Sequence, residues 1–228
     1  MLILFILLIS FFVFLYNLYY ISHEDFVIVR KDISIDKILS MAFLTGLVTL
    51  FFSRFFYAIF NPSPQVINLL GFFAITYFPG FSLSGGILGG SIFIYFYSKF
   101  NKLPIGKMLD LITYSFIGVL PVSFLLFFIL NFGKTDMVFN VFFISIFLLS
   151  IIFIKLIYRF PEKGEIKDGS FSLIFLSVFS LIFFLIKLFS DISAFSFFDL
   201  ENIILFILIF SSLIVLVNRE IIDKFLGK

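Results

Sequence analysis

Five of the chain's thirteen glycines lie in the stretch Gly80-Phe81-Ser82-Leu83-Ser84-Gly85-Gly86-Ile87-Leu88-Gly89-Gly90, which runs directly into the apolar residues 91–97. Glycine is a poor helix former in water, yet small residues spaced by four let two membrane helices approach closely. The pairs Gly85/Gly89 and Gly86/Gly90 have this spacing. We therefore expect residues 81–98 to form a membrane helix that another segment approaches closely.

The same stretch also has a functional interpretation. Its bare backbone and the hydroxyls of Ser82 and Ser84 would present hydrogen-bond donors to a lipid phosphate or glycerol at the start of the helix. The spacing of the glycines does not decide between close packing and lipid binding.

The composition indicates an integral membrane protein. Of 228 residues, 62% are hydrophobic and 13% are charged, whereas about a quarter of the residues of a soluble domain are charged. Such a chain is divided into spans of about 20 residues each. We predict an all-α, polytopic membrane helical bundle that forms a single domain over residues 1–228, with seven transmembrane helices. The predicted spans are 2–22, 38–60, 81–98, 108–131, 138–158, 170–189 and 203–217.

One further apolar segment, residues 67–78, is too short to cross a bilayer and ends at Pro79-Gly80. It is predicted to be an interfacial or re-entrant helix.

Positive charge predicts the orientation, because cytoplasmic loops carry an excess of lysine and arginine. Three such residues follow each of the first, third and fifth spans, and three more lie in the tail. They are Arg30, Lys31 and Lys37; Lys99, Lys102 and Lys107; Arg159, Lys163 and Lys167; and Arg219, Lys224 and Lys228. The opposite loops hold Lys134 among acidic residues. The pattern predicts an outside N-terminus and an inside C-terminus.

Charge and residue types also exclude several kinds of site. The formal net charge is +2, and no basic run exceeds Arg30-Lys31, so a nucleic-acid partner is not expected. With no cysteine and one histidine, the chain predicts no metal site. No cofactor is expected either.

Charged residues inside a membrane are functional candidates because they are costly there. Arg54 lies about two-thirds along the second predicted span and is the best such candidate. It would bind a lipid phosphate or extend its side chain to the interface. Asp110, within a turn of a span end, is interpreted as interfacial.

Several runs occur in an order that resembles a known family. They are Ile33-Ser34-Ile35-Asp36-Lys37, Phe43-Leu44-Thr45-Gly46, Ser53-Arg54-Phe55-Phe56-Tyr57-Ala58-Ile59-Phe60-Asn61, and then Phe81 to Gly90. This order is similar to that of the bacterial prolipoprotein diacylglyceryl transferases, seven-span inner-membrane enzymes. Their second span ends in a Gly-Arg-x-Gly-Tyr type run, and Met-Ser-Phe-His-Gly-Gly follows. The likeness covers residues 33–133 and, more weakly, 159–217.

The resemblance implies transfer of diacylglycerol from phosphatidylglycerol, or another anionic phospholipid, to the lipobox cysteine of a lipoprotein precursor. It also implies a place in the bacterial inner (plasma) membrane. On this reading Arg54, Ser82, Gly85 and Gly86 bind the substrate, and Ser84 and Asn131 are catalytic.

The chain departs from the family pattern at residues that carry the chemistry. Ser84 stands where the family has histidine, and a serine hydroxyl does not accept a proton near neutral pH. Of the family's signature near residues 123–133, only Asn131 is present, without the arginine and glutamate. The implied enzyme is therefore divergent or catalytically impaired, a pseudoenzyme in the second case.

Two other function classes stay open. The first is a non-catalytic phospholipid-binding or membrane assembly protein on the same fold. A small-solute transporter is the other class, marked only by Arg54 and by Pro121 within the fourth span.

Overall fold

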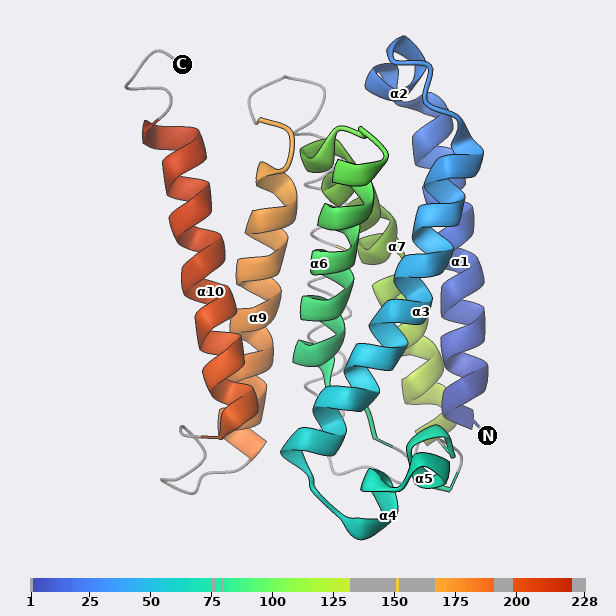
Figure 1. The fold of residues 1–228 in the computed structure, drawn as a ribbon, viewed down its shortest axis with the longest axis vertical. Coiled ribbons are helices and arrows are strands. Elements are labelled where there is room, and N and C mark those ends of the chain that lie inside the picture. The colour runs from blue at the N-terminus through green and yellow to red at the C-terminus, as the bar shows by residue number, and fades with distance from the viewer. Residues whose placement is uncertain are drawn as a thin grey trace. The chain divides into compact units, whose positions relative to one another are not determined.

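The computed structural model describes residues 2–74, 77–78, 80–131, 151, 167–190 and 199–222. Within these ranges the chain forms helices joined by short irregular segments, with no β-strand (Figure 1). The helices are α1 (Leu2–Glu24), α2 (Phe26–Arg30), α3 (Ile35–Phe60), α4 (Pro64–Ile67), α5 (Leu69–Phe73), α6 (Leu83–Phe100), α7 (Ile105–Asn131), α9 (Ser170–Ser190) and α10 (Leu200–Val217), followed by the π-helical turn η3 (Asn218–Ile222). The predicted all-helical class is confirmed.

Four of the described helices are long and apolar enough to cross a membrane. These segments are Phe5–Glu24, Ile35–Phe60, Ile105–Leu126 and Leu200–Glu220. A shorter apolar helix, Ser170–Leu185, lies within α9, and α6 falls at the predicted span 81–98. The predicted span 138–158 lies outside the described residues, apart from residue 151. The chain is a helical membrane protein, while its seven spans and its orientation stay predictions.

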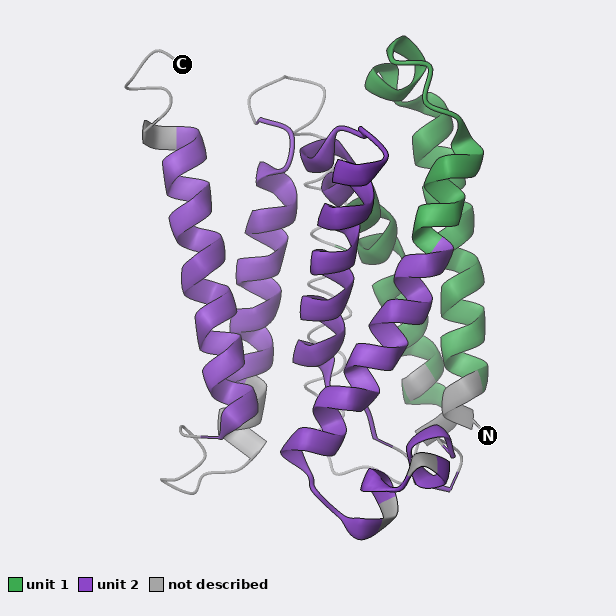
Figure 2. Cartoon of the chain, in the orientation of Figure 1, with its two compact units in different colours: residues 1–42, 111–166 green, residues 43–110, 167–228 purple. Residues whose placement is uncertain are grey.

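The chain forms two compact units, which Figure 2 shows in different colours. Unit 1 comprises residues 1–42 and 111–166, and unit 2 comprises residues 43–110 and 167–228. The helix α3 begins in unit 1 and ends in unit 2, whereas α7 begins in unit 2 and ends in unit 1. The candidate site described below lies within unit 2.

In unit 1, α1 contacts the second part of α7 through small and polar residues. The hydroxyl oxygens of Ser10 and Ser123 are 2.7 Å apart. A Cβ atom at Gly118 would lie 2.7 Å from Nδ2 of Asn17, so α7 lies close to the Asn17 side chain of α1 at this position. Close approach at small residues is the usual way in which membrane helices pack.

In unit 2, α9 and α10 lie side by side along their lengths (Figure 1). Two carboxylates hold the start of α9. Asp110 of α7 accepts hydrogen bonds from the backbone N–H groups of Gly169 at 2.6 Å and Ser172 at 2.8 Å. Glu220 of η3 accepts one from the hydroxyl of Ser170 at 2.5 Å. Asp110 is buried within the protein, and its interfacial depth stays a prediction. The first N–H groups of a helix lack intrahelical partners and favour a negative charge.

The connection between α3 and α6 holds two short helices. Ser63 caps α4 by accepting a hydrogen bond from the N–H group of Val66, and Pro64 occupies the start of α4, where no N–H group is needed. Asn68 has an extended backbone, with φ −67° and ψ 137°, and separates α4 from α5. The segment predicted as one helix over residues 67–78 is thus interrupted at Asn68, and α5 within it ends at Phe73.

Candidate functional site

Ser82 lies at the start of α6 and is held there by α3. Its backbone N–H donates to the carbonyl of Ser53 at 3.0 Å, and its own carbonyl accepts from the Ser53 hydroxyl at 2.7 Å. Its extended backbone and its hydroxyl make it the N-cap of α6, because Oγ accepts the N–H of Gly85 at 3.2 Å. These contacts fix the position of the Ser82 hydroxyl relative to α3.

A carboxylate from α10 meets this hydroxyl and that of Ser84. Glu201, in the first turn of α10, accepts hydrogen bonds at Oε1 from Ser82 Oγ at 2.9 Å and from Ser84 Oγ at 3.3 Å. The two hydroxyl oxygens are 2.9 Å apart. Both serines are buried, whereas Glu201 is half-buried. We call Ser82, Ser84 and Glu201 the serine–glutamate cluster.

The serine–glutamate cluster combines hydrogen-bond donors with a proton acceptor. A serine hydroxyl donates and accepts hydrogen bonds, but only the ionised carboxylate is a competent base near neutral pH. The Glu201 side chain that carries this carboxylate is half-buried. The cluster therefore has the parts needed to orient a hydroxyl, ester or thiol and to take a proton from it.

Arg54 projects from α3 into the connection that precedes Ser82. Its guanidinium group donates to three backbone carbonyls: Nε to Phe72 at 3.0 Å, Nη1 to Gly80 at 2.8 Å and Nη2 to Gly71 at 3.1 Å. The residue is only 2% exposed, because the connection covers its guanidinium group. Its role as a phosphate ligand stays a prediction, and a phosphate would have to share this group with three carbonyls.

Tyr57 fixes the same connection one helical turn further along α3. The guanidinium carbon of Arg54 lies 5.5 Å from the centroid of the Tyr57 ring. A Cβ atom at Gly80 would lie 2.1 Å from Cζ of that ring. The backbone at Gly80 therefore lies directly against the Tyr57 ring, two residues before Ser82.

The glycines of α6 contact α3. A Cβ atom at Gly85 would lie 2.4 Å from Cβ of Phe56, and one at Gly89 would lie 2.5 Å from Cβ of Phe52. The next face, at Gly86 and Gly90, lies against Thr49. The expectation that another segment approaches closely here is confirmed, and that segment is α3.

The close packing on α3 does not test the predicted role of Gly85 and Gly86 in substrate binding, which stays a prediction. The N–H of Gly85 donates to Ser82 Oγ, and the N–H of Gly86 donates to the Ser82 carbonyl at 3.1 Å. A lipid bound to these two N–H groups would have to replace the hydrogen bonds that begin α6.

The remaining predicted site residue, Asn131, is the last residue of α7 and belongs to unit 1. Its catalytic role stays a prediction. Among the described residues, no group of three or more histidine, cysteine, aspartate or glutamate side chains is placed to hold a metal ion.

Glu201 is the residue that the sequence interpretation missed. It lies 119 positions after Ser82 and was counted only as one of the acidic residues of an outer loop. A weak signal was present, since Glu201 falls in the first turn of a helix, where a carboxylate often has a structural or binding role.

Comparisons of this chain with protein-family models, with curated proteins and with solved structures found no match in any of the three.

Proposed function

We propose that this chain is a divergent diacylglyceryl transferase of the bacterial plasma membrane. Its substrates would be phosphatidylglycerol and the lipobox cysteine of a lipoprotein precursor. The observation that carries the proposal is the hydrogen bond from Ser84 Oγ to Glu201 Oε1, 3.3 Å long. Ser84 stands where the resembling enzymes have histidine, and Glu201 brings a proton acceptor to that position.

The reaction assigns a separate role to each group. Glu201 takes the proton of the cysteine thiol, and the sulfur forms a bond to the glyceryl carbon of the lipid. The bond from that carbon to the phosphate oxygen breaks, and glycerol phosphate leaves with the electron pair. Ser82 and Ser84 donate hydrogen bonds and hold the carboxylate in place.

Transfer is tested with the full chain in proteoliposomes that contain phosphatidylglycerol with labelled acyl chains and a lipobox peptide. We expect a thioether-linked diacylglyceryl peptide. Glu201→Gln keeps an acceptor oxygen but removes the base, so product formation should fall by about 100-fold or more. Glu24→Gln is the matched control, because Glu24 is an exposed glutamate at the end of α1. Product at the protein-free level from the unsubstituted chain would reject the transferase.

A second candidate is a non-catalytic phospholipid-binding or membrane assembly protein. It is favoured by Ser84, which stands where the resembling enzymes have histidine and is not itself a proton acceptor near neutral pH. This protein would retain phosphatidylglycerol through purification and form no thioether product. Loss of the lipid under the same conditions would count against it.

We also propose the seven-span topology with the N-terminus outside and the C-terminus inside. The distribution of lysine and arginine supports it. Because the chain has no cysteine, single-cysteine variants report sidedness without background labelling. Lys31→Cys and Lys102→Cys should react with an impermeant maleimide only after the membrane is opened. Asp199→Cys should react in intact cells, and the reverse pattern would overturn the orientation.

A further inference from the structure

The stretch between Arg54 and Lys99 contains no aspartate, glutamate, lysine, arginine or histidine. It includes the whole connection from the end of α3 to the start of α6. By contrast, the connection before α3 contains Lys31 and Asp32, and the one after α6 contains Lys102. A connection of this length in water normally carries charged residues, so its composition indicates an apolar environment.

Four large apolar side chains on this connection are exposed, beside the uncharged polar residues Asn61 and Asn68. Ile67 is 65% exposed, Leu70 79%, Phe73 66% and Tyr77 81%. Exposed apolar side chains gathered on one short segment mark a site of interaction with a membrane or another apolar partner. We call residues 64–78, with the exception of Ile75 and Thr76, the α4–α5 segment.

The α4–α5 segment turns back toward the part of α3 that crosses the membrane. The rings of Phe51 and Phe72 have centroids 5.8 Å apart. Phe51 lies nine residues before the end of α3 at Phe60, which corresponds to about 14 Å along the helix axis. Helix α3 has 26 residues, or about 39 Å, against a hydrocarbon core of about 30 Å. The Phe72 ring therefore lies at a level of α3 that is inside the hydrocarbon.

Arg54 provides hydrogen-bond donors for the carbonyl groups at the end of α5 and beyond it. The last carbonyl groups of a helix have no intrahelical partner, and water is absent from the bilayer core. Arg54 donates to the carbonyls of Gly71 and Phe72, within the last three residues of α5, and to Gly80 beyond it. A cation at the C-terminal end of a helix also interacts favourably with the helix dipole. The buried arginine thus matches the needs of irregular backbone in lipid.

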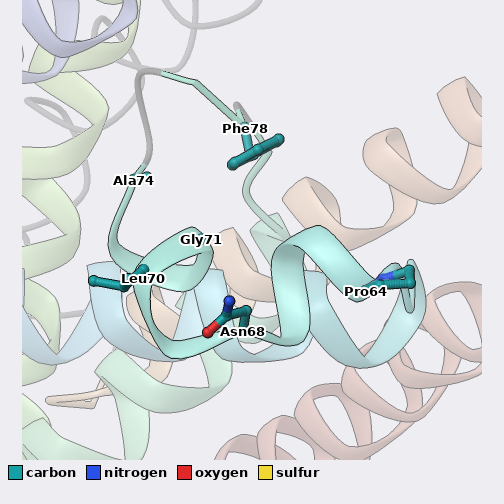
Figure 3. A pocket seen from close by; sticks show the side chains of 6 residues that line it. All are labelled: Pro64, Asn68, Leu70, Gly71, Ala74 and Phe78. Atoms are coloured by element: carbon teal, nitrogen blue, oxygen red, sulfur yellow. The ribbon is translucent and has the colours of Figure 1, made fainter.

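We propose that the α4–α5 segment is immersed in one leaflet of the bilayer, where it contacts lipid acyl chains, and that Arg54 is the positioning residue that holds it there. The segment also forms a cavity of about 400 Å³ (Figure 3). The cavity is lined by Pro64, Asn68, Leu70, Gly71, Ala74 and Phe78. This inference does not depend on the transferase reaction.

The immersion is tested with nitroxide labels on single cysteines, in nanodiscs of phosphatidylcholine and phosphatidylglycerol. Labels replace Ile67, Phe73 and Tyr77, with Leu47 on the exposed face of α3 as the lipid control and Lys102 as the water control. At the three test positions, we expect collisions with oxygen to exceed collisions with a water-soluble nickel complex several-fold, as at Leu47. Values at the test positions that match Lys102 would overturn the immersion.

The role of Arg54 is tested with the same labels in the Arg54→Gln variant. The labels at Phe73 and Tyr77 should shift toward the pattern of Lys102, while the label at Leu47 stays unchanged. Arg54→Lys keeps the charge but lacks the planar guanidinium group that reaches three carbonyls, so we expect a partial shift of the collision pattern. This variant also provides the test if Arg54→Gln does not fold. The positioning role would be rejected if the collision rates at Phe73 and Tyr77 stayed unchanged in the folded variants, or if the rates at Leu47 shifted equally.

Discussion

Glu201 Oε1 accepts a hydrogen bond from Ser82 Oγ at 2.9 Å, although the two residues are 119 positions apart in the chain. Because Ser82 begins α6 and Glu201 lies in the first turn of α10, the contact joins the starts of two helices. A carboxylate is favourable at both N-terminal ends. The same atom thus stabilises unit 2 and forms the proton acceptor of the proposed site, and variants can separate the two roles.

The two serines of the cluster should respond differently to removal of the hydroxyl. Ser82→Ala removes the N-cap of α6 and is expected to cost about 1 kcal/mol of stability. Ser84→Ala leaves the cap intact, so it should lower the midpoint of thermal unfolding less, measured by circular dichroism in detergent. Ser91→Ala, also on α6, is the matched control. An equal loss in Ser82→Ala and Ser84→Ala would show that the cap at Ser82 does not dominate.

The packing of α6 on α3 predicts unequal effects of alanine at two glycines. A Cβ at Gly89 would lie 2.5 Å from Cβ of Phe52, and the collision should cost about 1–3 kcal/mol. A Cβ at Gly86 would lie 3.3 Å from Cγ2 of Thr49, which a small shift accommodates. Gly86→Ala should therefore be close to neutral, because alanine also favours the helix by about 1 kcal/mol. A thermal unfolding midpoint for Gly89→Ala as high as that of Gly86→Ala would contradict the packing.

The start of α9 should depend on the charge of Asp110. Asparagine has one acceptor oxygen, so Asp110→Asn brings an amide N–H group against one of the two backbone donors, Gly169 or Ser172. We expect a loss of about 1.5–3 kcal/mol, seen as a lower midpoint of thermal unfolding. Asp36→Asn, at an exposed position in the first turn of α3, is the control and should cost far less. Equal losses of stability in the two variants would mean that the hydrogen bonds of Asp110 contribute no more than the interaction of Asp36 with the dipole of an exposed helix end.

The helices could be predicted from the sequence because each one is indicated by residues that are close together in the chain. Long apolar runs and the spacing of the α6 glycines predicted the class and the close approach of another helix. The identity of that helix was not predictable, because the spacing describes only one of the two surfaces. The single helix predicted over residues 67–78 was wrong at Asn68, because uniform apolar composition does not show where an extended residue interrupts a helix.

The candidate site was harder to predict because its contacts are distant in the chain or involve the backbone. Arg54 was correctly identified as an unusual charge, but its partners are carbonyl groups, which every residue has, and no residue type reveals them. Glu201 has a clear chemical role only once α10 is placed beside α6. The catalytic role of its partner Ser84 was implied by the family resemblance, and that resemblance did not include a base beside the last predicted span.

The three carbonyls that Arg54 binds have a consequence for the synthesis of the protein. They belong to residues 17, 18 and 26 positions later in the chain. When α3 first leaves the ribosome, its arginine has no such partners, and an unpartnered arginine in a membrane helix costs at most about 2.5–3.5 kcal/mol, the value at the helix centre. We therefore expect insertion of α3 to become more favourable once residue 80 has been made and the three carbonyls offset this cost.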